Sequence, residues 1–126
     1  MTEISTTGVG GAFAEALLAK EWVHLESLLS SEIDFRGLTP RKQWEASTAK
    51  GLIDTVFAQW FGPTVAIYEI IDIATDRITD RQRVVYRFRV HKEECDYVCE
   101  QTAYFDEIDG KIVTLRILCS GFLPVR

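Results

Sequence analysis

The fold is decided by the stretch from Cys95 to Phe122, which reads CDYVCEQTAYFDEIDGKIVTLRILCSGF. Two runs rich in β-branched and aromatic residues flank Ile108-Asp109-Gly110, and this pattern predicts a β-hairpin. A three-residue loop would place Cys99 opposite Cys119 and gather the apolar side chains of the second strand on one face. A two-residue turn at the Asp-Gly pair would bury Arg116 instead. A one-residue change of register turns every side chain to the opposite face of the sheet. We expect the three-residue loop, because it keeps the apolar side chains together.

Length and composition indicate one globular domain over residues 1–126, with 1–9 as a loose lead-in of small and polar residues. Hydrophobic residues make up 47% and charged residues 26% of the chain, which is ordinary for a folded protein. The net charge of −5 argues against a nucleic-acid surface, which needs a basic face. The sequence has no membrane-length apolar run and no signal-peptide pattern. We therefore expect a cytoplasmic protein without nucleic-acid or membrane partners.

Cysteine and histidine usage gives no sign of a metal site or a disulfide framework. The chain has three cysteines, an odd number. Its two histidines, His24 and His91, do not combine with the cysteines into a zinc-ligand spacing. We expect no metal and no cofactor.

The first half of the chain reads as helical with one short strand. Apolar residues at helical spacing predict one bent helix or two abutting helices from Gly11 to about Ser30. A short strand is expected at Ile33–Arg36, followed by a turn-rich segment over 37–46. An apolar stripe from Ala49 to Trp60 predicts a further helix, which Gly62-Pro63 ends.

Long strands follow and form a meander. Residues 65–74 and 83–92 read as strands that precede the hairpin. A two-residue turn at Glu93-Glu94 would pair Tyr86 with Gln101 inward and Arg87 with Glu100 outward. Helices segregated against one face of an antiparallel sheet make an α+β fold. A sheet curled around helices leaves a cone whose open end is the natural pocket.

This order and several motifs resemble the nuclear transport factor 2-like (NTF2-like) superfamily, in particular its small bacterial SnoaL-like branch. The resemblance implies a cone-shaped, cystatin-like roll with N-terminal helices packed in a strongly curved, mostly antiparallel sheet. It also implies a homodimer formed through the convex sheet face. The superfamily hosts isomerases, dehydratases, cyclases, epoxide hydrolases and plain binding modules, so the fold does not fix the function. The residues that carry the resemblance are Ala12–Leu17, Trp60-Phe61-Gly62, Glu100–Tyr104, Asp109–Ile112 and Leu118–Pro124.

Ketosteroid isomerase is the most informative comparator in this superfamily. It uses a carboxylate base at the end of the first strand, and a Tyr with a protonated Asp as oxyanion donors. The resemblance places Asp34 at the base position, Phe13 near the Tyr position and Gln101 at the second donor position. One donor is thus missing and the other is an amide, which argues against the same steroid chemistry. The Asp-Arg-Asp arrangement of limonene-epoxide hydrolase has no counterpart.

Each candidate has two interpretations. Asp34 is either a general base in the cone or a solvated strand residue, with Ile33 and Phe35 pointing inward; we favour the solvated residue. Gln101 either binds a ligand or bonds the Tyr86 hydroxyl opposite. The pocket is expected to be lined by Phe13, Arg36, Trp44, Tyr86, Phe88, Cys99, Gln101, Ile117 and Cys119.

The buried cysteines also have two interpretations. Cys99 and Cys119 are expected as cross-strand neighbours on the buried face. They are either a redox pair or a nucleophile, or else two small apolar fillers. Because no histidine lies near them to activate a thiol, the fillers are favoured. Arg36 at the pocket mouth could clamp a carboxylate or pair with a local acid.

The sequence thus favours a small-molecule pocket. We expect it to bind a small apolar organic molecule, with proton-transfer chemistry of the isomerase, cyclase or lyase type if the protein is an enzyme. The alternatives are a non-catalytic ligand-binding module and a dimeric protein-interaction module that works through the convex sheet face.

Overall fold

The computed structural model describes residues 8–125. Residues 1–7 of the expected lead-in lie outside this range, whereas Gly8 and Val9 already belong to the first helix. Two abutting helices, α1 (Gly8–Leu18) and α2 (Trp22–Ser27), begin the chain. None of the helices in the described range is long and apolar enough to cross a membrane.

A second helical stretch follows the first two strands. It runs through α3 (Ala49–Gly51), the π-helical segment η1 (Leu52–Phe57) and α4 (Ala58–Trp60). The hydroxyl oxygen of Thr48 accepts the N–H of Gly51 at 3.0 Å and so caps the first turn. The apolar stripe expected here is buried against the sheet.

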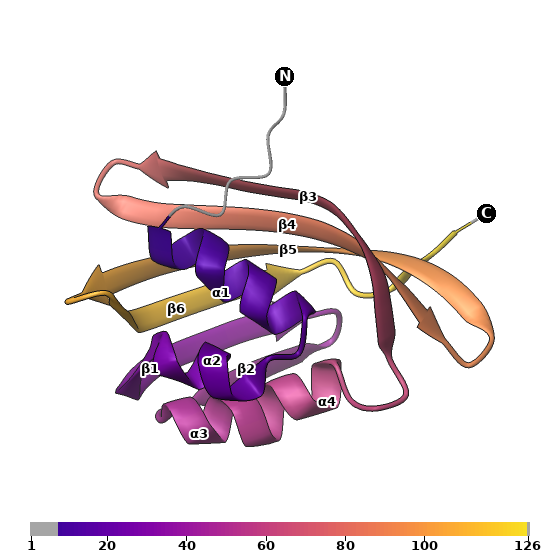
Figure 1. The fold of residues 1–126 in the computed structure, drawn as a ribbon, viewed down its shortest axis with the longest axis horizontal. Coiled ribbons are helices and arrows are strands. Elements are labelled where there is room, and N and C mark those ends of the chain that lie inside the picture. The colour runs from indigo at the N-terminus through magenta and orange to yellow at the C-terminus, as the bar shows by residue number, and fades with distance from the viewer. Residues whose placement is uncertain (1–7, 126) are drawn as a thin grey trace.

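The strands form one curved, unclosed sheet that wraps around the helices (Figure 1). Its order is β2-β1-β6-β5-β4-β3, with β7 paired to β5, and among the strand pairs of residues 8–125 only β1–β6 is parallel. Helices cover the concave face, so the fold is α+β as expected. The strands are β1 (Leu29–Thr39), β2 (Lys42–Ala46), β3 (Ala66–Ile78), β4 (Arg81–Lys92), β5 (Cys95–Ile108), β6 (Lys111–Cys119) and β7 (Leu123–Pro124).

The expected short first strand and turn-rich segment are corrected by the structure. β1 is far longer than Ile33–Arg36, and the segment over 37–46 contains an edge strand, β2. Thr39 pairs with Lys42 across a tight turn, in which Arg41 takes a positive φ of 72°. The polar residues of β2 suit an edge strand, because only one of its edges is paired.

The turn of the decisive hairpin is also corrected. Ile108 pairs with Lys111, so the loop has two residues, Asp109 and Gly110, and both have positive φ. This is the backbone twist that two-residue hairpin turns favour. The register then shifts by one residue at Val113, a β-bulge that leaves this residue without a partner.

The bulge preserves the expected faces while changing the expected partners. Beyond it, Gln101 and not Cys99 lies opposite Cys119. Leu115 and Ile117 are buried and Arg116 faces outward, as the three-residue loop would also have required. The turn is one residue shorter than expected, and the bulge adds one residue to β6. These two differences cancel, so the side chains of β6 keep the expected directions.

The β4–β5 pair confirms the expected register. Lys92 pairs with Cys95 around a two-residue turn at Glu93-Glu94. Tyr86 lies opposite Gln101, and Arg87 lies opposite Glu100 with an outward ion pair of 2.5 Å. The long pairing of β4 with β5 therefore places the polar side chains of Tyr86 and Gln101 next to each other on the inward face.

Candidate functional site

Tyr86 and Gln101 form a polar centre inside the apolar core. The Tyr86 hydroxyl donates to Gln101 Oε1 at 2.7 Å, and neither side chain has meaningful exposure. Burial raises the pKa of Tyr86 well above its usual value, so the phenol stays protonated as a donor. The two expected roles of Gln101 are thus not exclusive, because this bond uses only the oxygen of its amide.

A cleft of about 200 Å³ opens beside this centre, where the strands β1, β4 and β6 end and α4 packs against them. Four of its ten lining residues are aromatic, and four are polar or charged. The lining residues are Thr39, Trp44, Gln59, Trp60, Phe61, Lys92, Gln101, Cys119, Gly121 and Phe122. Lys92 is the charged residue of this set, and its Nζ lies 5.8 Å from the centre of the Phe122 ring.

Two buried N–H donors of the lining residues have no hydrogen-bond partner in the described part of the chain. They are Nε1 of Trp60 and Nε2 of Gln101. A buried donor without an acceptor costs about 1–3 kcal/mol, so such groups normally have a partner. Their residues line one cleft, and the Gln101 amide nitrogen has only the sulfur of Cys119 beside it, so an oxygen acceptor at this cleft would suit both donors.

A thiol pair lies at the cleft wall, where Cys119 is a lining residue and Cys99 lies behind it. The sulfurs of Cys99 and Cys119 lie 3.6 Å apart, which confirms that these residues are neighbours across the strands. The Gly121 N–H donates to Cys119 Sγ at 3.3 Å. Because the Cys99 thiol, the Gln101 amide and this N–H favour the anion, the pKa of Cys119 falls to about 6 against the opposing effect of burial. The pKa of Cys99 is raised, chiefly by Cys119 and then by burial.

Of the expected lining residues, Trp44, Gln101 and Cys119 meet at this cleft. Phe13, Tyr86, Phe88 and Cys99 instead pack in the core, each without exposed surface. The rings of Phe13 and Tyr86 lie 6.4 Å apart at 65°, and Tyr86 stacks on Phe88. The interior of the cone is therefore filled by aromatic side chains, and the open space is confined to its rim.

Arg36 and Ile117 border a different, shallow groove of about 250 Å³, which lies between β2, β1 and β6 and also includes Trp44. Arg36 approaches Glu45 at 4.0 Å, so its pairing with a local acid is the interpretation that the structure supports.

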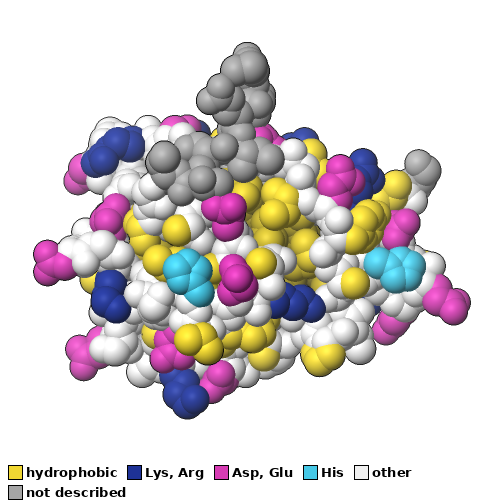
Figure 2. Space-filling model, in the orientation of Figure 1, with side chains coloured by type: hydrophobic (Ala, Val, Ile, Leu, Met, Phe, Trp, Pro, Cys, Tyr) yellow, Lys and Arg dark blue, Asp and Glu magenta, His cyan; other side chains and the backbone are white. Residues whose placement is uncertain are grey.

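Charges of both signs are scattered over the helical face, and hydrophobic side chains gather in a hollow beside α1 (Figure 2).

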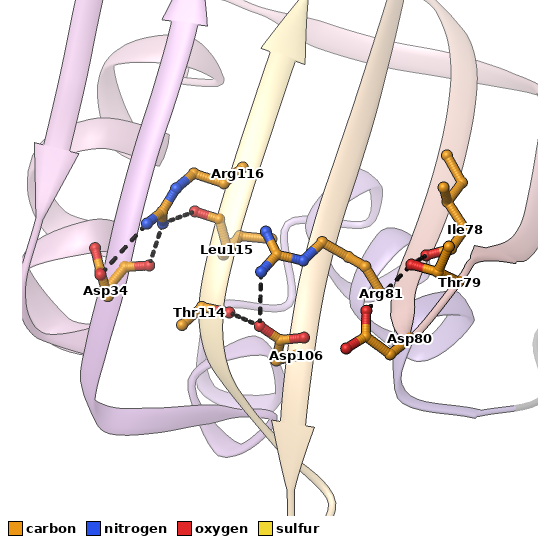
Figure 3. A network of polar contacts seen from close by, with 9 residues as sticks. All are labelled: Asp34, Ile78, Thr79, Asp80, Arg81, Asp106, Thr114, Leu115 and Arg116. Atoms are coloured by element: carbon orange, nitrogen blue, oxygen red, sulfur yellow. Dashed lines mark hydrogen bonds and ion pairs between the residues drawn. The ribbon is translucent and has the colours of Figure 1, made fainter.

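Asp34 lies on the outward face of β1, away from the cleft. Its side chain is 58% exposed and pairs with the Arg116 guanidinium at 3.3 Å, as Figure 3 shows. Ile33 and Phe35 point inward, which was the favoured interpretation of this strand. The strand alternation that buries these two residues keeps Asp34 out of the cone.

Sequence reasoning missed Trp60, Lys92 and Phe122 as cleft residues. Trp60 ends the apolar stripe of the predicted helix, a pattern typical of core residues, and it is 8% exposed. Its indole N–H was the available signal, because a buried Trp normally needs an acceptor. The activation of Cys119 was missed because the donors are a second thiol, an amide and a backbone N–H rather than a histidine.

The comparisons with known proteins agree with this architecture. A protein from Burkholderia thailandensis described as NTF2-like superposes with a TM-score of 0.71 at 14% identity, over 89% of this chain and 88% of that chain. The chain has the NTF2-like fold. No family model and no curated protein matches it.

Other NTF2-like structures resemble the chain to a similar degree. A Catenulispora acidiphila protein with a ketosteroid isomerase-like fold, in complex with trimethylamine, gives a TM-score of 0.67 at 11% identity, over 93% of this chain and 88% of that one. An epoxide hydrolase of Mycobacterium tuberculosis gives 0.63 at 13% identity, over 89% and 80%. At these identities the likeness concerns the fold alone.

Proposed function

We propose that the protein binds a small, mainly apolar organic molecule that carries a hydrogen-bond acceptor, in the cleft beside Gln101. The observation that supports this most directly is the pair of buried donors without an oxygen acceptor, Trp60 Nε1 and Gln101 Nε2, whose residues line the same cleft. A carbonyl, ester or epoxide oxygen would satisfy them. The volume of about 200 Å³ is below the range of about 300–1,000 Å³ for drug-sized ligands, which favours a compact molecule.

Binding is better supported than proton-transfer chemistry. The described lining residues of the cleft include no carboxylate, and Asp34 lies on the outward face in an ion pair with Arg116. Carbon acids need a positioned base within hydrogen-bond reach. Neighbouring folds include an epoxide hydrolase and a protein that holds trimethylamine, so small ligands suit this architecture.

The experiment compares two probes of similar shape, cyclohexanone and methylenecyclohexane, by ¹H–¹⁵N NMR. Cyclohexanone is expected to shift the Trp60 indole signal and the Gln101 side-chain amide signals saturably, since its oxygen accepts from both. Methylenecyclohexane lacks the acceptor and is expected to bind more weakly. Equal affinity for the two probes, or no shift at either donor, would contradict the proposal.

Two variants locate the site. Gln101→Leu is expected to weaken cyclohexanone binding about tenfold, the effect of losing one hydrogen bond of about 1.4 kcal/mol. Gln43→Leu is the matched control, because Gln43 lines the outer groove instead. If Gln101→Leu does not fold, Trp60→Phe tests the second donor alone. A loss of binding in the Gln43 variant would place the site in the outer groove.

A further inference from the structure

Cys99 and Cys119 form one site with two unequal thiols. Their sulfurs lie 3.6 Å apart, within the described range that contains all three cysteines of the chain. Cys119 borders the cleft, whereas Cys99 lies behind it without exposed surface. The third cysteine, Cys95, is exposed at the start of β5 and has no part in this pair.

The surroundings assign a different role to each sulfur. Cys119 receives the N–H of Gly121 at 3.3 Å and lies beside the amide of Gln101, and both groups favour a thiolate there. The neighbours of Cys99 are the Ser120 hydroxyl at 4.0 Å and Cys119 itself. The accessible sulfur is thus the better nucleophile, and the enclosed sulfur is placed to react with it afterwards.

We propose that Cys119 reacts with a hydroperoxide admitted by the cleft and that Cys99 resolves the product, giving a reversible Cys99–Cys119 disulfide. The Cys119 thiolate attacks the distal peroxide oxygen, the O–O bond breaks, and the alkoxide or hydroxide leaves after taking up a proton. Cys119 is then a sulfenic acid. The sulfur of Cys99 attacks the sulfur of Cys119, the S–O bond breaks, and water leaves with the proton of Cys99. The two thiols lose two electrons in total and the peroxide gains them.

The second step requires the two sulfurs to approach each other across neighbouring strands, where Cys99 is the diagonal neighbour of Cys119. A disulfide needs the sulfurs at about 2.05 Å, so the pair must approach by about 1.5 Å. β6 ends at Cys119, and Gly121, two residues further on, has a φ of 79°. The Ser120 N–H still donates to the Glu100 carbonyl oxygen at 2.9 Å, so we expect the sulfurs to approach mainly by rotation of the two cysteine side chains. The proposal does not depend on ligand binding in the cleft.

The test uses the full chain with Cys95→Ser, which removes the exposed thiol, and hydrogen peroxide as the oxidant. After treatment the protein is unfolded in N-ethylmaleimide and weighed by intact mass spectrometry. We expect a mass lower by two hydrogen atoms, no maleimide adduct, a Cys99–Cys119 cross-linked peptide on digestion, and full reversal by dithiothreitol. Two maleimide adducts per chain after peroxide, or a cross-link only between chains, would overturn the proposal.

Two further variants in this background separate the roles. In Cys99→Ser, dimedone is expected to trap a sulfenic acid at Cys119, because the resolving thiol is gone. In Cys119→Ser, Cys99 is expected to stay reduced and take up maleimide on unfolding. Oxidation of Cys99 at an undiminished rate in that variant would overturn the order of attack. If either variant fails to fold, peptide mapping of the wild-type chain still decides whether the cross-link forms.

Discussion

The Tyr86 hydroxyl and the Gln101 amide oxygen are joined by a 2.7 Å hydrogen bond in the middle of the sheet, between two residues that face each other directly. The bond fixes which end of the amide is used inside the core. The nitrogen end is left for the cleft. One buried pair thus links the packing of the core to the polar character of the rim.

Removing the Tyr86 hydroxyl should destabilise the protein by about 1–3 kcal/mol, because Gln101 Oε1 would be buried without a donor. Urea denaturation of Tyr86→Phe would measure this. Tyr68→Phe is the control, since Tyr68 is 52% exposed, and it should change the free energy of unfolding by at most about 0.5 kcal/mol. In a double-mutant cycle, Tyr86→Phe should cost less when Gln101 is already Leu; strictly additive effects would show that the bond contributes nothing.

Lys20 ties the end of α1 to the connection between α4 and β3. Its Nζ donates to the carbonyl oxygens of Gly62 at 2.9 Å and Val65 at 2.5 Å, and partial burial lowers its pKa. Lys20→Met should therefore cost about 1.5–3 kcal/mol, the range for hydrogen bonds to a charged group. Thermal and urea denaturation would measure it.

Lys50→Met is the matched control for this substitution. Lys50 pairs with Asp54 at 3.1 Å, but the side chains are 78% and 57% exposed. Exposed pairs of this kind contribute at most about 0.5 kcal/mol. Similar losses in the two variants would contradict the role assigned to the Lys20 contacts.

The reactivity of Cys119 should depend on pH with a midpoint near the lowered pKa of about 6. Alkylation by iodoacetamide needs the thiolate, so the rate should rise as pH increases through this value, against about 8.5 for a free cysteine. The titratable neighbours are the Cys99 thiol and the Tyr86 phenol, and Lys92 is the charged residue that lines the same cleft. Mass spectrometry of the alkylated peptide at several pH values would give the midpoint.

The Cys99 thiol is the largest cause of this lowered pKa, so Cys99→Ala should move the midpoint upward. The lowered pKa of Cys119 also makes the stability of the folded protein depend on pH. A thiol whose pKa is lower in the folded state contributes stability above its unfolded pKa, and this contribution is lost as pH falls through about 6. An unchanged alkylation midpoint in Cys99→Ala would contradict the assigned cause.

We also propose that two copies of the chain pair through the outward sheet face. Leu38 and Leu118 are neighbours in the β1–β6 pair and are 45% and 49% exposed on that face. Leu118→Glu should shift the protein toward the monomer in light scattering, because it places a charge in an apolar contact. Val23→Glu is the control, since Val23 is 88% exposed on α2. A monomeric wild-type protein at working concentration would contradict the pairing.

Parts of this structure could be predicted because local chemistry determines them. The two-residue turn at Glu93-Glu94 fixes Tyr86 opposite Gln101, and both side chains must share a face. The alternation around Asp34 likewise favoured Ile33 and Phe35 as the buried residues of β1, and both are buried. The first prediction needs only the length of one turn, and the second needs only the two-residue period of a strand.

Other parts depend on distant contacts that no local pattern contains. The bulge at Val113 leaves the apolar face of β6 unchanged, so the apolar pattern could not distinguish it from a longer loop. The filling of the cone depends on the combined volume of rings such as Phe13 and Phe88, which come from separate elements. Predicting the cleft would have required knowing that Trp60 and Gln101 lie close together. These residues are far apart in the sequence, so no local pattern indicates their proximity.

The unpaired Val113 also determines where this chain can change its length. Deleting it would join Ile112 to Thr114 and leave every pair from Asp106–Thr114 to Gln101–Cys119 in place. Deleting a residue further along β6 would turn Cys119 to the other face, because each lost residue reverses the alternation. An evolving gene could therefore lose one codon at this position and keep its polar centre. The same loss a few codons later would remove Cys119 from the cleft.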